Sequence, residues 1–204
     1  MIYGYLRTAM ERTKRDRKTE LLEVAERLFR EKGYQGVSLG QFARAAGIRK
    51  PSLYHHFPGG KEELFVAVQT RMFERMGAEL KQTIEDAGPW LPDQLHAAAR
   101  WFLAQPPMFM LSMIHKDMAE LSDQGRAVLG RASYGLIMGP LMAAVRQACA
   151  RGDAREIDPH TVAGAFLAVI ESNTVAHRAG FGSGDLPGMV AGSVDLLLYG
   201  ALRR

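Results

Sequence analysis

Apolar residues recur at helical spacing along most of the chain. The first apolar stripe has charged residues on its other face and follows the i, i+4, i+7, i+8 rule of an amphipathic helix: Leu21, Ala25, Leu28 and Phe29. Gly33 supplies the left-handed residue that ends many helices, so we expect this helix to end near Lys32. No useful length of sequence alternates apolar and polar residues as a half-buried strand does. The pattern predicts an all-α protein of about nine helices.

Two short helices are expected next. Ser38, with Gln41 three positions later, has the pattern of a capping box and predicts a helix over about 39–46, which Gly47 ends. Pro51 is compatible with the first turn of a helix, where backbone N–H groups have no internal partner. Residues 58–60 then break the chain before a further helix at Lys61. Three short helices with a tight glycine turn are the layout of a helix-turn-helix unit.

Beyond the turn the pattern predicts longer helices. We expect a connecting helix over 61–85, a helix over 92–104, a short segment over 108–121 and a long helix over 123–151. Two regular amphipathic helices end the chain. Their apolar stripes either form an internal core hairpin or pack against a second copy of the chain: Val162, Phe166, Val169, Ile170, Val190, Val194, Leu197, Leu198 and Ala201.

Charge is divided unevenly along the chain. Residues 1–60 contain twelve Lys or Arg and six Asp or Glu, a net of +6, whereas the remaining residues carry a net of −2. A basic segment on a slightly acidic body indicates a module for a polyanion attached to a part with another task. The single cysteine, Cys149, excludes an internal disulfide, the N-terminus does not resemble a signal peptide, and no uncharged stretch reaches membrane-spanning length. We expect a cytoplasmic protein with no membrane partner.

A group of separated positions resembles the N-terminal domain of the TetR (tetracycline repressor-like) family. The matching motifs are Ala25-x-x-Leu28-Phe29, Gly33-Tyr34, Ser38-Leu39, Ala43-x-x-Ala46-Gly47-Ile48, Leu53-Tyr54-His55-His56-Phe57 and Lys61-Glu62-Glu63-Leu64. The resemblance covers roughly the first third of the chain. It implies a helix-turn-helix DNA-binding domain over 15–60 and a larger helical domain for effector binding and dimerisation over 61–204. It also favours a dimer interface for the two C-terminal stripes, because helix-turn-helix units usually read paired half-sites.

The third helix is the expected DNA-reading element. A helix in the major groove presents its N-terminal side chains to base edges, where Arg or Lys donate to guanine and Ser serves either kind of partner. Residues further along contact phosphates, a role that the resemblance supports for Tyr54, His56 and Lys61. The predicted contacts are Ser38, Arg49, Lys50, Pro51, Ser52, Tyr54, His55, His56 and Lys61. Two have structural alternatives, Ser38 as a helix cap and His56 as a hydrogen-bonding group inside the domain.

A methionine-rich stretch over 105–118 suggests an adaptable apolar wall, since methionine suits pockets for irregular apolar guests. With neighbours from adjacent helices it predicts a ligand site, although any single one of these residues is more often a core residue. The predicted lining is Trp101, Met108, Phe109, Met113, His115, Tyr134, Met138, Asn173 and His177. His115 with Asp117 lacks the spacing of a metal site, so no metal and no cofactor are expected.

The sequence therefore predicts a sequence-specific transcriptional regulator, a homodimeric repressor that binds a palindromic operator in double-stranded DNA. A small, largely apolar effector would release it by favouring a different spacing of the two recognition helices, which lie about 34 Å apart on one DNA turn. No nucleophile elbow, phosphate loop or metal motif indicates an enzyme. The alternative is a helical protein–protein interaction module that no longer reads DNA.

Overall fold

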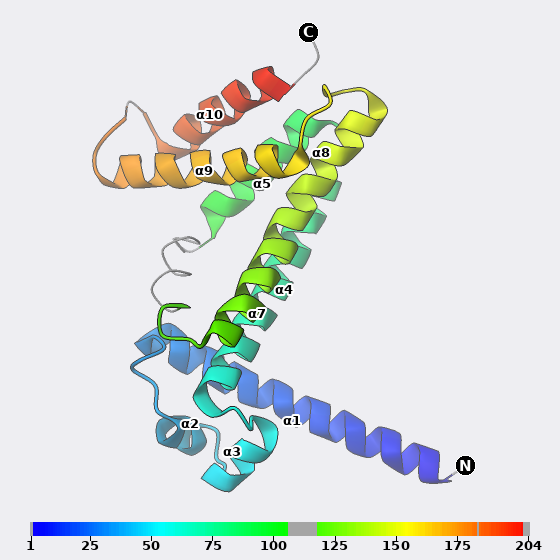
Figure 1. Cartoon of the computed structure of the whole chain (residues 1–204), viewed down its shortest axis with the longest axis vertical. Helices are drawn as coiled ribbons and strands as arrows, with labels where there is room; N and C mark the ends of the chain where they lie inside the picture. Colours follow the sequence, from blue (N-terminus) through cyan, green and yellow to red (C-terminus); the bar gives the residue numbers. More distant parts are fainter. Residues whose placement is uncertain (1, 106–117, 183, 202–204) are drawn as a thin grey trace. The chain divides into compact units, whose positions relative to one another are not determined.

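The computed structural model describes residues 2–105, 118–182 and 184–201 (Figure 1). The regular elements of this described part are all helical, which confirms the predicted all-α class. They are α1 (Ile2–Lys32), α2 (Leu39–Ala45), α3 (Lys50–His56), α4 (Gly60–Asp86), α5 (Leu91–Ala104), α7 (Asp123–Ser133), the π-helix η1 (Tyr134–Met138), α8 (Gly139–Arg151), α9 (Pro159–Arg178) and α10 (Leu186–Ala201).

Contacts divide the described chain into two compact units. The N-terminal unit contains α1, α2, α3, α4 as far as Met72, and the chain from Met118 to Gly130. The body unit contains the remainder of α4 and α7 with α5, η1, α8, α9 and α10. The boundary between these two units lies within α4, after Met72, so one helix contributes residues to both.

The first apolar stripe builds the core of the N-terminal unit. Leu21, Ala25 and Phe29 are buried, and the Phe29 ring packs edge-on against Phe65 of α4 with ring centroids 5.0 Å apart. Gly33 takes a φ of +68° and donates its N–H to the Phe29 carbonyl at 2.9 Å. The predicted end of α1 is therefore confirmed, and the helix begins much earlier than the stripe, at Ile2.

Polar contacts tie α4 to two other segments of the N-terminal unit. The Arg71 guanidinium donates to the Thr19 carbonyl and to the Glu23 carboxylate, each at 3.2 Å. The Glu62 carboxylate accepts the Ser122 backbone N–H at 3.2 Å and also the Ser122 hydroxyl. The segment that leads into α7 is consequently anchored on the first turns of α4.

In the body unit, α9 packs on α8 and α10, and α10 also packs on α5 (Figure 1). Leu95, Val145, Phe166 and Val194 bring the four helices together in one core and are essentially inaccessible to solvent. Burial of such apolar area is the main source of stability for an amphipathic helix.

The expected long helix over 123–151 is present, but its backbone is not regular throughout. Between α7 and α8 the π turn η1 interrupts the α-helical hydrogen-bond pattern, a detail that hydrophobic periodicity does not report. The whole span is long and apolar enough to cross a membrane by length and composition alone. Leu141, Ala144, Val145 and Ala148 are nevertheless buried within the body unit, as in the core helix of a folded domain.

The apolar stripes of the two C-terminal helices are largely covered within a single chain. Six of the nine residues assigned to a dimer interface are buried within a single chain: Val162, Phe166, Ile170, Val190, Val194 and Leu198. A side chain that is already covered has no surface to offer a partner, so these six form the internal hairpin that was the alternative. Val169 and Leu197 are half-buried, and Ala201 is the last residue of α10. The large exposed apolar side chains of α10 are instead Leu196 and Tyr199.

Candidate nucleic-acid interface

The turn between α2 and α3 is fixed by local hydrogen bonds. The Gln41 N–H donates to the Ser38 hydroxyl oxygen at 3.2 Å, and the Ser38 N–H donates to Gln41 Oε1 at 2.9 Å. This reciprocal pair is the predicted capping box. Gly47 has a φ of +63°, which an L side chain rarely adopts, and the next residue, Ile48, donates its N–H to the Ala43 carbonyl at 3.0 Å. The chain therefore reverses tightly into α3.

One face of α3 holds the helix in place and the other is free. Leu53 and the C-cap residue Phe57 are fully buried. Four side chains in and before the first turn are exposed: Arg49, Lys50, Pro51 and Ser52. Arg49 occupies the N-cap position and makes no side-chain cap hydrogen bond, so its charge is directed to solvent and not to the helix end. The residues predicted to meet base edges thus share one accessible surface.

Further along α3 the predicted phosphate contacts differ in accessibility. Tyr54 is 50% exposed, and His55 is exposed as well. His56 is half-buried between its ring neighbours, His55 at 5.6 Å and Phe57 at 6.5 Å between centroids. His56 therefore faces both the domain and the solvent, whereas Tyr54 and His55 project from the surface that also carries the first turn.

Lys61, a predicted phosphate contact, lies against an aromatic ring of its own domain. Its ammonium is over the Tyr34 ring, 4.3 Å from the centroid, in a cation–π contact. Burial, with a smaller effect of the Glu62 and Glu120 carboxylates, raises the pKa of the Tyr34 hydroxyl. The first turn of α4 already carries Glu62 and Glu63, and the Glu63 carboxylate accepts the Gly59 N–H at 2.7 Å. These carboxylates weaken the attraction of this helix end for a phosphate.

The charge of the α2–α3 surface has one sign. From Gly33 to Gly60 the sequence contains Arg44, Arg49 and Lys50 and no Asp or Glu. Arg44, in the last turn of α2, is exposed and was not among the predicted contacts. Its signal was available in the sequence as the one basic residue of the second helix.

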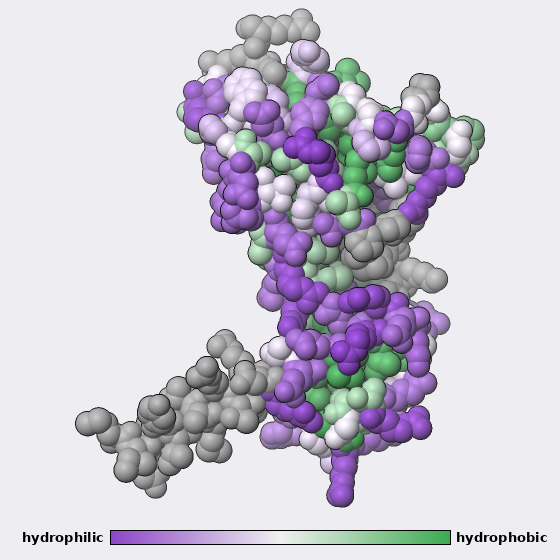
Figure 2. All heavy atoms as spheres, turned by 180° about the vertical axis from the view of Figure 1, so that it is seen from behind, coloured by the Kyte–Doolittle hydropathy of each residue, from purple (hydrophilic) through white to green (hydrophobic). Residues whose placement is uncertain are grey.

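In Figure 2 the hydrophobic residues visible on each unit are bordered by hydrophilic ones, as expected for folded units in water.

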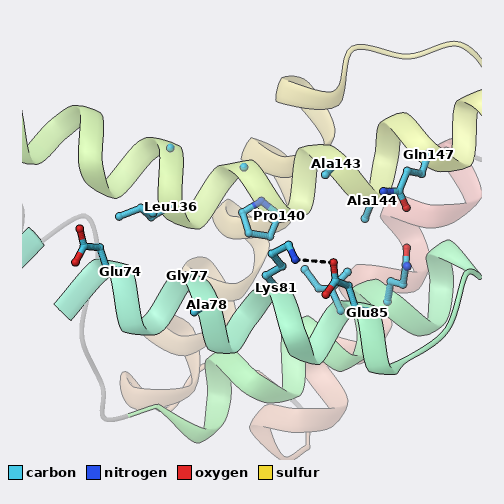
Figure 3. A pocket seen from close by; sticks show the side chains of 14 residues that line it. Glu74, Gly77, Ala78, Lys81, Glu85, Leu136, Pro140, Ala143, Ala144 and Gln147 are labelled. Atoms are coloured by element: carbon cyan, nitrogen blue, oxygen red, sulfur yellow. Dashed lines mark ion pairs between the residues drawn. The ribbon is translucent and has the colours of Figure 1, made fainter. Parts of the chain in front are cut away.

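The body unit has a groove of about 580 Å³ between α4 and the η1–α8 segment (Figure 3). Six of the fourteen residues along it are Gly or Ala, and Gln94 reaches it from α5. Its lining residues are Glu74, Gly77, Ala78, Lys81, Ile84, Glu85, Gln94, Gly135, Leu136, Gly139, Pro140, Ala143, Ala144 and Gln147. Gly135, Gly139 and Ala143 recur every four residues on the η1–α8 side, whereas α4 contributes the adjacent pair Gly77 and Ala78.

The five predicted ligand residues that lie in the described part of the chain are not among those that line this groove. Trp101 is half-buried against Phe102, and Met138 is buried. Tyr134 is exposed and stacks on His160 at 5.7 Å, and His177 is exposed. The Asn173 amide donates to the Val169 carbonyl at 2.7 Å and to the Ser193 hydroxyl at 2.9 Å. Four further predictions lie outside the described residues: Met108, Phe109, Met113 and His115.

Together, the capped second helix, the glycine turn and the exposed first turn of α3 define a helix-turn-helix DNA-binding unit. The sequence model of bacterial regulatory proteins of the tetR family matches residues 21–68. Residues 21–68 therefore match the DNA-binding domain of that family, and the described chain has the fold seen in solved TetR-family structures.

Relatives and solved structures agree with this assignment. Over 70 residues the chain is 39% identical to the HTH-type transcriptional regulator LmrA of Bacillus subtilis (strain 168), a match that covers 34% of this chain and 37% of LmrA. The match spans about a third of the length of such curated relatives.

Among solved structures, a TetR-family regulator from Mesorhizobium loti superposes with a TM-score of 0.76 at 19% identity, over 92% of this chain and 98% of that one. AibR, in a complex with isovaleryl coenzyme A and operator DNA, gives a TM-score of 0.59 at 24% identity, over 88% and 97% of the two chains. At these identities both structures support the fold alone.

Proposed function

We propose that this protein is a sequence-specific transcriptional regulator, a homodimeric repressor that a small ligand releases from operator DNA. The observation that carries the proposal is the exposed first turn of α3. Arg49, Lys50 and Ser52 project from a helix that Leu53 and Phe57 anchor in the core. Donors at these positions match the acceptors that guanine and adenine present in the major groove. The absence of acidic residues from Gly33 to Gly60 favours approach to a phosphate backbone.

The beginning and the end of α3 would have different roles in the proposed complex with DNA. Lys50 and Ser52 would read base edges, whereas Tyr54, His55 and the half-buried His56 would contact phosphates and fix the position of the helix in the groove. Ser38 caps α2 in the free protein and keeps a hydroxyl at the surface. Lys61 would reach a phosphate only by leaving the Tyr34 ring.

A second copy of the chain is the proposed partner on the outer face of the C-terminal hairpin. Leu196 and Tyr199 of α10 are 77% and 75% exposed, and Val175 of α9 is half-exposed. Exposed large apolar side chains on adjacent helices mark association sites in soluble proteins. Pairing two such hairpins about a two-fold axis would form a four-helix interface and present two α3 helices to one palindromic operator.

Release by a ligand would act through α4. This helix begins after the helix-turn-helix at Gly60 and ends in the body unit at Asp86, where its residues line the groove. A ligand changes DNA affinity only by the difference in its affinity for the two conformations, and a shift from 99:1 to 1:99 requires about 5.5 kcal/mol. The AibR complex with an acyl-coenzyme A and DNA supports a ligand-responsive protein of this fold.

A regulator that binds operator DNA would act in the cytoplasm, and we propose that location for this protein.

Fluorescence anisotropy of labelled duplexes tests the proposal. The full chain should bind one sequence far more tightly than a scrambled duplex, and its affinity should fall steeply with salt as counterions are released. Lys50→Ala should weaken DNA binding and relax its sequence preference. Arg100→Ala, which removes an exposed positive charge from the body unit away from the groove, should leave both unchanged. Equal binding to all duplexes, unaffected by Lys50→Ala, would instead support the protein–protein interaction module.

A further inference from the structure

The groove in the body unit is lined in part by Gln94, a residue whose side-chain acceptor is buried and has no partner among the described residues. Gln94 lines the groove and is only 4% exposed. Its Nε2 donates to the Gly88 carbonyl at 2.7 Å, and because a carbonyl only accepts, this bond fixes which end of the amide is which. The other end, Oε1, is buried and has no hydrogen-bond partner among the described residues. A buried acceptor left in this state costs stability, which a ligand's donor would restore.

The walls around Gln94 suit a compact apolar group. Figure 3 shows Gly77 and Ala78 on α4 across the groove from Pro140 and Ala143 on α8, and Ile84 of α4 also lines it. The volume of about 580 Å³ is within the usual range of small-molecule sites. The π turn η1 contributes lining residues at one end, and such turns occur frequently at functional sites.

The charges at the groove favour a cation over an anion. Lys81 is the one Lys or Arg among the described residues that line it, and its ammonium is paired with the Glu85 carboxylate at 2.8 Å. Figure 3 shows this pair on α4, with Glu74 further along the same helix. A carboxylate or phosphate ligand would therefore find no unpaired cation in the lining, whereas a protonated amine would find carboxylates at the rim and an acceptor inside.

We propose that this groove binds small apolar amines, with an aromatic or aliphatic body between α4 and α8 and an ammonium N–H donating to Gln94 Oε1. The class differs from the anionic acyl-coenzyme A in the AibR complex. This inference rests on the proposed function only for its regulatory consequence, namely that such an amine is the effector.

Isothermal titration calorimetry of the full chain at pH 7 with three matched probes tests it. The probes are 4-phenylbutylamine, its trimethylammonium derivative, which keeps the charge but has no N–H, and 4-phenylbutyrate, which reverses the charge. The amine should bind roughly tenfold more tightly than the trimethylammonium compound, because a hydrogen bond to a charged group contributes about this factor. The carboxylate should bind most weakly. Equal affinities, preference for the carboxylate, or no binding of the amine would overturn the proposal.

Three variants assign the effect to the site. Gln94→Leu should abolish the difference between the amine and the trimethylammonium compound, and Ala143→Phe, which fills the groove from α8, should abolish binding of both. The matched control Gln82→Leu changes an exposed glutamine of α4 that is not among the lining residues, and it should preserve the difference. A preference for the amine that survives Gln94→Leu would place the hydrogen-bond acceptor elsewhere and refute the assignment. The wild-type comparison decides the ligand class even if a variant does not fold.

Binding of a selected operator duplex, measured on the same samples, separates the two proposals. Specific DNA binding without preference for the amine would refute this inference and leave the proposed function standing. Preference for the amine without specific DNA binding would do the reverse. With both present, saturating amine should lower the operator affinity at least tenfold; an unchanged affinity would overturn the effector role.

Discussion

Replacement of Ser38 separates its two possible roles. Ser38→Ala removes the hydroxyl that accepts the Gln41 N–H at 3.2 Å, while Gln41 Oε1 can still accept the residue 38 N–H. Loss of a helix N-cap of this kind costs about 1 kcal/mol. Because α2 has only seven residues, one lost hydrogen bond is a large part of what fixes its first turn. We therefore expect Ser38→Ala to reduce the free energy of unfolding by about this amount.

Ser38→Asp provides the contrast, since aspartate caps helices as well as serine does but adds a negative charge. If Ser38 also lies against a phosphate, Ser38→Asp should retain the stability of wild type and lose DNA affinity. Urea unfolding followed by circular dichroism measures the stability, and hydrogen exchange at the Gln41 amide reports the cap directly. Unchanged stability and unchanged Gln41 exchange in Ser38→Ala would refute the capping role. Unchanged DNA affinity in Ser38→Asp would refute the phosphate contact.

Four other predictions follow from the structure. Lys50→Ala should cost about 1–3 kcal/mol of binding free energy on the preferred duplex and little on a scrambled one, as measured by anisotropy. Gly77→Ala would place a Cβ 2.5 Å from the Leu136 carbonyl oxygen and should destabilise the body unit by about 1–3 kcal/mol in thermal unfolding. The control Gly164→Ala adds a Cβ in open space on α9 and should not destabilise it. Asp158 caps α9, and the hydrogen bonds that it accepts from the Thr161 hydroxyl and the His160 N–H lower its pKa. Its contribution to the free energy of unfolding is therefore present above the unfolded-state pKa and is lost as the pH falls through the folded-state pKa. Asp158→Asn should flatten that part of the stability–pH profile. Leu196→Asp should leave the fold intact by circular dichroism and yield monomers in sedimentation.

Local signals were sufficient for much of the N-terminal unit. The end of α1 at Gly33, the capping box at Ser38 and the turn at Gly47 each depend on residues a few positions apart, so the sequence contains the whole cause. The exposed first turn of α3 followed from the same reasoning, because burial of Leu53 and Phe57 leaves the other face outside.

The rest depends on which distant residues meet. Periodicity identified the apolar stripe with Phe166 and Val194, but it cannot tell whether α8 and α5 or a second chain covers that stripe. Lys61 looked like a free cation until the fold brought it over Tyr34. The groove at Gln94 is formed by α4, α5 and α8 together, and no single segment carries its pattern. The methionine-rich stretch over 105–118 was predicted to line a ligand site because composition is a local property of the sequence.

Selection of bound duplexes from a random pool tests the central claim most directly, because it examines base reading and two-fold symmetry at once. We expect an enriched inverted repeat with half-sites about one helical turn apart, and Lys50→Ala should lose base preference at one position of each half-site. Recovery of duplexes with no common sequence, or of the same sequence regardless of the residue at position 50, would contradict it.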